Sequence, residues 1–140
     1  MPRRLHVALI RASTLHRKRC REEFYRYNLS EGQPKVLAYL LIEEGVLQKD
    51  LAVKCGVKPA TMTALLKKML AEDLIRREAV YVSGGKRAFG IYLTPRGRDR
   101  AEKAMEVIDR MEVRSFQGFS PEEREQLVSL LDRVSQNLKN

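Results

Sequence analysis

The sequence has little cysteine and little histidine. Its two cysteines, Cys20 and Cys55, lie far apart and form neither a CxxC pair nor a zinc-ligand spacing. We therefore expect no disulfide framework, and free thiols of this kind fit a reducing compartment such as the cytoplasm. The only histidines are His6 and His16, which are too far apart on a helix to hold one metal ion. We expect no metal site, no cofactor and no histidine-based catalytic centre.

Sequence signatures of several other protein classes are also missing. The chain contains no glycine-rich phosphate-binding loop, no HExxH pair and no GxSxG elbow, so nothing indicates an enzyme. Charged residues interrupt every apolar run before it could span a bilayer. The apolar stretch near the amino terminus ends at Arg11, which is too early for a secretory signal. We expect a cytoplasmic protein.

What the sequence does have is an excess of positive charge. Its 140 residues include 27 Lys and Arg against 18 Asp and Glu, which gives a net charge of +9 and a pI near 9.8. Hydrophobic residues make up 44% and charged residues 32%, so the chain can bury a core and fold as one ordinary domain. The basic balance favours a polyanionic partner, with nucleic acid first and a membrane surface second.

The positive charge is unevenly distributed along the chain. Residues 1–30 carry a net charge of +6, residues 31–93 carry +3 and residues 94–140 carry zero. The balanced last third is typical of helices that pack on protein rather than on phosphate. The dense basic run at 17–21 admits three interpretations: contact with DNA phosphates, the lining of a pocket below a dimer interface, or an ordinary solvated helix face.

Both ends of the chain carry apolar stripes of helical period. One helix is expected over residues 3–27. Thr94-Pro95 and Ser120-Pro121-Glu122-Glu123 are start signals for two more. The three stripes comprise Leu5, Ala8, Leu9, Ala12 and Leu15; then Ala101, Ala104, Met105, Ile108 and Met111; and finally Leu127, Leu130, Leu131, Val134 and Leu138. One small core cannot cover so much apolar surface, so we expect the terminal helices to pair with a second copy of the chain.

The middle of the chain has the pattern of a helix-turn-helix. A capping box at Ser30-Glu31-Gly32-Gln33 predicts a helix that runs to about residue 44 and ends at Gly45. Residues 48–57 then predict a short helix that stops at a glycine turn, and Pro59 opens the next helix, from 60 to about 73. A second helix with a small, polar outer face is typical of DNA recognition. Its apolar face, with Met62, Leu66 and Met69, is expected in the core.

After residue 73 the period of the pattern changes from helix to strand. Two strand-like runs, 74–82 and 88–93, surround Gly84-Gly85 and predict a β-hairpin. Lys86 and Arg87 lie at its tip, so the hairpin is expected to form a basic wing beside the helix-turn-helix.

Four segments in this order resemble the MarR family of bacterial winged-helix regulators. They are Leu29-Ser30-Glu31-Gly32-Gln33 with Val36-Leu37, then Gln48-Lys49-Asp50-Leu51-Ala52 with Pro59-Ala60-Thr61-Met62-Thr63, then Gly85-Lys86-Arg87, and Leu93-Thr94-Pro95-Arg96-Gly97. The resemblance covers nearly the whole chain when the terminal helices are included. In the family's wing an Asp that helps to fix the arginine is usual, and Gly85 stands in its place here.

The resemblance implies an α+β fold, mainly α, built from three parts. Residues 1–29 and 94–140 supply the helices of a dimerisation lobe, and residues 30–93 form the winged helix-turn-helix DNA-binding lobe. It also implies a dimeric, cytoplasmic transcription regulator, more often a repressor, that binds a pseudo-palindromic operator in double-stranded DNA. A small-molecule effector would bind between the dimer helices and the DNA-binding lobe and change the lobe spacing.

The expected DNA contacts come from the outer face of the second helix and from the wing. Thr hydroxyls and methyl groups can meet base edges in the major groove, and Arg87 at the hairpin tip can enter a narrow minor groove. Arg76 and Arg77 flank the base of the wing, where phosphate contacts or local ion pairs are expected rather than base contacts. The full set is Thr61, Thr63, Ala64, Lys67, Lys68, Arg76, Arg77, Lys86 and Arg87.

Two alternatives to this function remain open from the sequence. Some relatives sense peroxides through a cysteine of the first helix, and neighbouring arginines would favour the thiolate of Cys20. The other interpretation is that Cys20 is a small, buried apolar residue; Cys55, beside the glycine turn, is expected in the core. The second alternative is a winged-helix module that contacts proteins and has no specific DNA site.

Overall fold

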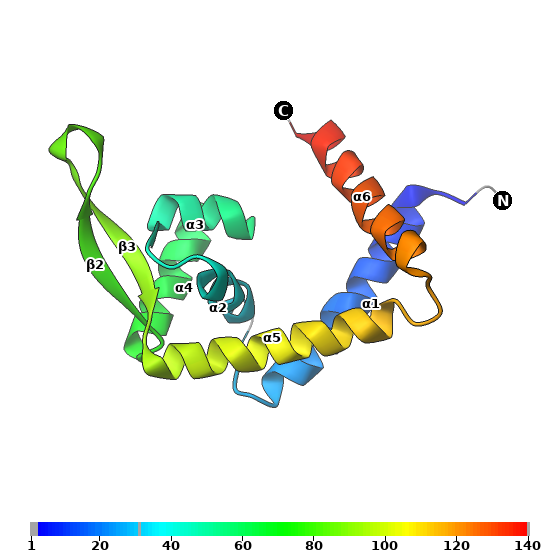
Figure 1. Cartoon of the computed structure of the whole chain (residues 1–140), viewed down its shortest axis with the longest axis horizontal. Coiled ribbons are helices and arrows are strands. Elements are labelled where there is room, and N and C mark those ends of the chain that lie inside the picture. Colours follow the sequence, from blue (N-terminus) through cyan, green and yellow to red (C-terminus); the bar gives the residue numbers. More distant parts are fainter. Residues whose placement is uncertain (1–2, 31, 140) are drawn as a thin grey trace.

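The computed structural model describes residues 3–30 and 32–139. In Figure 1 a winged helix-turn-helix lobe lies at one end of an elongated molecule, two helices from the chain ends lie at the other, and α5 runs between them. The elements are α1 (Leu5–Tyr25), α2 (Gln33–Ile42), β1 (Val46–Leu47), α3 (Gln48–Cys55), α4 (Pro59–Ala71), β2 (Ile75–Tyr81), the 3₁₀ turn η1 (Ser83–Gly85), β3 (Arg87–Leu93), α5 (Pro95–Ser115) and α6 (Pro121–Leu138). The expected α+β, mainly helical fold class is confirmed.

The sheet is small and antiparallel, with the strand order β1-β3-β2. The hairpin pairs Tyr81 with Arg87 at its tip and Ile75 with Leu93 at its base, as the Gly84-Gly85 pattern predicted. The two-residue strand β1 was not predicted. It pairs with β3 at Gly90. The missing side chain of Gly90 allows this close approach, since a Cβ there would lie 2.9 Å from the Gly45 carbonyl oxygen.

A single apolar core joins the helix-turn-helix to the sheet. Met62, Leu66 and Met69 are buried in it as expected, which fixes which face of α4 points outward. The start of α5 extends this core, with Ala101 and Ala104 fully buried. Because α5 shares this packed core with the helix-turn-helix and the sheet, it is a rigid connection to the DNA-binding lobe rather than a flexible linker.

The start of α5 lies very close to the turn that follows α4, at Asp73 and Leu74. The hydroxyl of Thr94 accepts from the Gly97 N–H over 2.9 Å and donates to the Asp73 carbonyl over 2.6 Å. A Cβ at Gly97 would overlap the Leu74 carbonyl oxygen. The Leu-Thr-x-x-Gly segment therefore combines a helix cap with a close backbone approach that requires glycine.

The two predicted capping boxes have different outcomes. At Ser120 the box is confirmed, since its hydroxyl accepts from the Glu123 N–H and the Glu123 carboxylate accepts from the Ser120 N–H. The prediction at Ser30 is wrong: α2 begins after Gly32 without a side-chain cap. The buried Gln33 side chain instead donates to Glu72 at the end of α4 over 3.0 Å. A buried amide requires a hydrogen-bond partner, and Glu72 supplies it from a distant helix.

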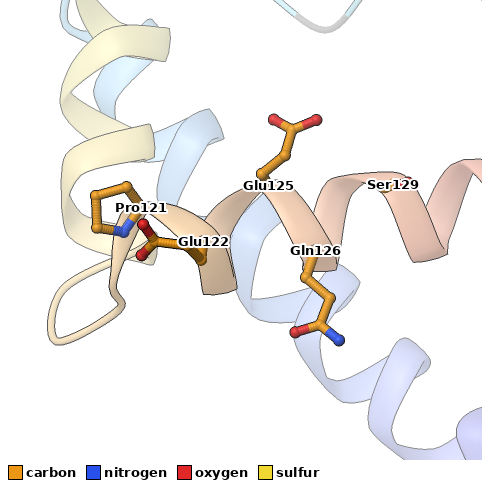
Figure 2. Close-up of a pocket in the computed structure, with 5 residues that line it drawn as sticks. All are labelled: Pro121, Glu122, Glu125, Gln126 and Ser129. Atoms are coloured by element: carbon orange, nitrogen blue, oxygen red, sulfur yellow. The ribbon is translucent and has the colours of Figure 1, made fainter.

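The terminal helices expose their apolar stripes. Over their described lengths, neither α1 nor α6 contains a buried residue. The exposed apolar side chains on the two helices include Leu5, Val7, Leu9, Ile10, Leu15, Leu127, Val128, Leu130, Leu131 and Leu138. The first turns of α6 also line a shallow depression that is open to solvent (Figure 2). A single chain leaves this apolar surface uncovered.

Candidate nucleic-acid interface

The outer face of α4 is fully presented to solvent. Thr61, Thr63, Ala64, Lys67 and Lys68 are all exposed, while the opposite face packs in the core. Pro59 begins the helix, where its missing N–H has no partner to lose. The structure thus brings the five predicted α4 residues together on one small, polar surface of the width that a major groove admits.

The hydroxyl of Thr63 is already engaged within the protein. It donates to the Pro59 carbonyl over 3.0 Å and accepts from the side-chain amide of Gln48 over 3.1 Å. The proton of this hydroxyl is therefore committed to the helix, and the methyl group is the part of Thr63 best suited to contact a base. Sequence reasoning missed Gln48 at the start of α3, since nothing local connects it to a residue 15 positions away.

The two lysines of α4 differ in their surroundings. Lys68 donates to the Ser30 hydroxyl over 3.2 Å, so its ammonium group is held beside the entry to α2. Lys67 has no hydrogen-bond or ion-pair partner within 3–30 and 32–139 and extends from the exposed face. A compact ammonium on a flexible stem is suited to a phosphate.

The wing presents its predicted basic tip. Lys86 follows the turn η1 and Arg87 begins β3, and both are exposed. Gly84 and Gly85 have φ values of 81° and 73°, in the left-handed region that glycine adopts without strain. The turn therefore depends on the two glycines, including the one at the position where the family usually has Asp.

The neighbouring arginines Arg76 and Arg77 lie on opposite faces of the hairpin, because side chains alternate along a strand. Arg76 forms an ion pair with Glu78 and stacks on the Tyr92 ring at 4.8 Å. Arg77 stacks on the Phe89 ring, also at 4.8 Å. The structure thus brings Arg77, and not Arg76, together with the wing tip. Phe89 was missed, although the strand alternation places it on the face of Arg77.

The root of the wing is fastened to α5 by Glu44. This carboxylate accepts from the Leu93 N–H over 3.3 Å and forms an ion pair with Arg98. The residues before β1, the end of β3 and the first turn of α5 are thereby held at one point. The base of the wing is thereby fixed against α5, and a wing held in a set orientation is a requirement for contacting two adjacent DNA grooves.

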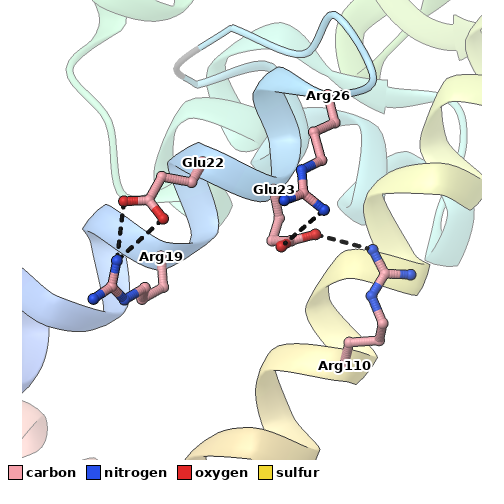
Figure 3. Close-up of polar contacts among 5 residues, drawn as sticks. All are labelled: Arg19, Glu22, Glu23, Arg26 and Arg110. Atoms are coloured by element: carbon pink, nitrogen blue, oxygen red, sulfur yellow. Dashed lines mark hydrogen bonds and ion pairs between the residues drawn. The ribbon is translucent and has the colours of Figure 1, made fainter.

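The basic run of α1 is partly used within the protein. Arg19 forms an ion pair with Glu22 over 3.1 Å, and Glu23 forms ion pairs with Arg26 over 3.6 Å and with Arg110 over 3.4 Å (Figure 3). The pair between Glu23 and Arg110 links α1 to α5. Exposed pairs of this kind stabilise little individually, and of these three only Glu23–Arg110 joins α1 to α5.

Burial is the main influence on the pKa of both thiols. Burial, followed by the nearby Glu112 carboxylate, raises the pKa of Cys20, and its Sγ lies 3.7 Å from His16 Nε2. Burial also raises the pKa of Cys55, which packs against the core as expected. A reactive thiol requires the opposite shift, toward the thiolate.

Known proteins share both the sequence pattern and the architecture of this chain. Residues 27–84 match the MarR family model. An HTH-type transcriptional regulator of Bacillus subtilis (strain 168), YdgJ, described as uncharacterized, is 26% identical over 112 residues, which cover 80% of this chain and 67% of that protein.

Solved structures give the same result for the fold. A MarR-family transcriptional regulator from Silicibacter pomeroyi has a TM-score of 0.80 and 26% identity and covers 94% of this chain and 88% of its own. The S. aureus MepR–DNA complex has a TM-score of 0.84 and 23% identity, with 97% of each chain covered.

The architecture defines a winged helix-turn-helix protein with long terminal helices. The matches agree with the resemblance seen in the sequence: residues 27–84 match the MarR family model, and the architecture is similar to that of a MarR-family transcriptional regulator. No helix in the described part of the chain combines the length and the apolar character that would be needed to span a bilayer.

Proposed function

We propose that the protein is a homodimeric regulator that binds double-stranded DNA sequence-specifically in the cytoplasm and acts as a repressor. The observation that carries the proposal is the exposed face of α4 on the same rigid lobe as a basic wing. Three structures of similar architecture were solved as DNA complexes: MepR, CouR and Rv2887. The proposal assigns no catalysis to the chain.

In the proposed complex, α4 enters the major groove and the wing reaches the adjacent minor groove. Thr61, Ala64 and the Thr63 methyl group contact base edges, while Lys67 and Lys68 contact phosphates. Arg87 enters the minor groove, where the negative potential is enhanced, with Lys86 beside it. Arg77 supports the wing contact, and Arg76 contributes through its ion pair at the wing base.

The proposed dimer is formed by α1 and α6 with the end of α5. Burying their exposed apolar side chains would cover an apolar surface of the kind that marks protein interaction sites. A two-fold axis through this interface would place the two α4 helices about one DNA turn apart, roughly 34 Å, and match them to a pseudo-palindrome.

An effector is proposed to act through the spacing of the two DNA-binding lobes. Each lobe is continuous with α5 through the shared core, so a small rotation of the terminal helices moves α4 and the wing as one body. A small molecule that stabilises a different spacing would release DNA. By linkage, DNA would then weaken the binding of that molecule by the same factor.

The first experiment is titration of the protein against the DNA upstream of its own gene and against a shuffled duplex, at two salt concentrations. We expect a preference of about a hundredfold or more, which corresponds to roughly 2.7 kcal/mol. Equal binding to both duplexes that weakens steeply with salt would mean a nonspecific DNA-coating protein. No binding at either salt concentration would favour a protein-interaction module instead.

Two substitutions show whether the assigned surface carries the binding. Arg87→Ala should weaken binding to the preferred duplex by roughly 1–3 kcal/mol. Lys139→Ala removes the same charge at the carboxyl end of α6, away from the wing (Figure 1), and its affinity should stay close to wild type. Equal losses in both variants would mean that net charge, rather than the wing, determines the affinity.

A further inference from the structure

Two arginines of the wing share one aromatic ring. The guanidinium carbon of Arg77 lies 4.8 Å from the centroid of the Phe89 ring, and that of Arg87 lies 5.3 Å from it. Both distances are within the range of a cation–π contact. Arg77 comes from β2 and Arg87 from β3, so the ring joins cations from both strands.

The strand register explains why these three side chains meet. Ala79 pairs with Phe89, Arg77 with Ile91 and Tyr81 with Arg87, so all six residues lie on one face of the hairpin. Arg87 lies two positions before Phe89 on the same strand, and Arg77 is diagonal to Phe89 across the pair, a separation that long and aromatic side chains can bridge. The small side chain of Ala79 leaves room beside the ring.

The shared ring holds two positive charges that have no paired carboxylate in the described part of the chain. Within residues 3–30 and 32–139, neither Arg77 nor Arg87 forms an ion pair, whereas Arg76 on the opposite face is paired with Glu78. Two cations beside one ring repel each other, and an anion placed next to them removes that repulsion. The two adjacent positive charges on the wing face around Phe89 therefore favour the binding of a polyanion.

We propose that Phe89 is a positioning residue of the DNA interface, which holds Arg77 and Arg87 as a pair so that both engage the DNA backbone and minor groove. This inference rests on the proposed function. Phe89 supports the wing arginine, since an aromatic ring two residues beyond Arg87 on the same strand restricts its side chain. An arginine that is already oriented loses less conformational entropy on binding than a free one.

The test uses the full chain and a duplex enriched by the wild-type protein from a random-sequence pool, with affinity measured by fluorescence anisotropy. Phe89→Leu removes the ring but keeps an apolar side chain and both positive charges. We expect it to bind about 3- to 10-fold more weakly. Phe89→Tyr and Phe89→Trp keep a ring for the cations and should bind like wild type.

Tyr81→Leu is the matched control on the same face of the hairpin. Tyr81 is an exposed aromatic residue, and no arginine stacks on it in the described chain. Its replacement should change the affinity by less than about twofold. Thermal unfolding of each variant shows whether the hairpin remains folded, and since Phe89 is partly exposed we expect little change in stability.

A double-mutant cycle separates positioning from a direct contact. If Phe89 acts through Arg87, then Arg87→Ala should weaken binding less in the Phe89→Leu background than in wild type. Additive losses would overturn the positioning role, and so would tyrosine and tryptophan variants as weak as the leucine variant.

The failure of this inference differs from the failure of the proposed function. If the wild-type protein enriches no duplex, the proposed function fails and the inference fails with it. If wild type binds and Phe89→Leu binds equally well, only the role of Phe89 is overturned.

Discussion

The side-chain amide of Gln48 donates to the hydroxyl of Thr63 over 3.1 Å, and this bond connects the two helices of the helix-turn-helix on their exposed side. The same hydroxyl donates to the Pro59 carbonyl. Together the two bonds fix the χ1 rotamer of Thr63, because both involve its single hydroxyl oxygen. The orientation of its methyl group follows from that rotamer, so α3 determines how a residue of α4 meets a base.

The role of the Thr63 methyl group can be measured with two substitutions. Thr63→Val keeps the shape and the methyl group but removes the hydroxyl, and we expect it to retain most of the specific affinity. Thr63→Ala also removes the methyl contact and should weaken specific binding by about 1 kcal/mol, at the low end of the range for base contacts. If valine loses as much as alanine in the same titration, the hydroxyl itself contacts the DNA.

Introducing a charge into the exposed apolar stripes should separate the proposed dimer. Leu9 on α1 and Leu131 on α6 are each 39% exposed in the single chain, and an acidic side chain there would remain unpaired in the interface. We expect wild type to scatter light as a particle of twice 16.2 kDa, and Leu9→Glu with Leu131→Glu to shift the mass toward the monomer.

Ile42→Glu is the control for this measurement. Ile42 is 79% exposed at the end of α2 in the DNA-binding lobe, so the same kind of substitution lies outside the proposed interface. It should leave the mass of the particle unchanged. A monomeric wild type at micromolar concentration would contradict the interface.

The close contact at the start of α5 predicts a large loss of stability for Gly97→Ala. The added Cβ would overlap the Leu74 carbonyl oxygen, and backbone cannot move aside as a side chain can. We expect a loss of about 2–3 kcal/mol in the free energy of unfolding, at the upper end of overpacking effects. Denaturant unfolding at one fixed protein concentration measures it, because dimerisation makes stability depend on concentration.

Gly118→Ala provides a contrast within the same chain. Gly118 has a φ of 86° but no heavy atom within 4 Å of an added Cβ. The only penalty there is the left-handed backbone conformation, about 1 kcal/mol. If Gly97→Ala were no worse than Gly118→Ala, the approach of α5 to the turn after α4 would be looser than described.

The raised pKa of Cys20 predicts a slow thiol. Burial and the Glu112 carboxylate both disfavour the thiolate, so in a Cys55→Ser protein the rate of alkylation by iodoacetamide should reach half its maximum only above pH about 8.5, the ordinary thiol pKa. The raised pKa also makes the free energy of unfolding depend on pH. The contribution of Cys20 is constant below about pH 8.5 and falls as the pH rises toward the folded-state pKa, because the unfolded chain loses the thiol proton first.

The opposite result would support the redox alternative. An alkylation rate that is already at its maximum near pH 7 would mean a stabilised thiolate, as peroxide-sensing cysteines have. In that case organic peroxide should release DNA from wild type but not from Cys20→Ser.

The order and type of the main elements could be predicted from the sequence because each rests on signals within a few residues. Ser120 and Glu123 cap one helix within a single turn, and Gly84 with Gly85 sets the hairpin. On α4, the period of Met62, Leu66 and Met69 determined which face would be buried, and so it also determined which residues would be available to DNA.

The details of the candidate site were decided by tertiary structure. The strand Val46–Leu47 is too short to have a period and exists only because β3 accepts it at Gly90. The capping prediction at Ser30 failed because the Gln33 amide found Glu72 on a distant helix. In the wing, strand register placed Arg77 and Arg87 on one aromatic ring.

The physical reason for this division is the range of the interactions. Caps, turns and apolar periods involve groups that are close in the chain, so residue types alone determine them. The Gln48–Thr63 bond and the contacts of Phe89 form only after the chain has closed the loops between their partners, and their geometry depends on the packed core that holds them.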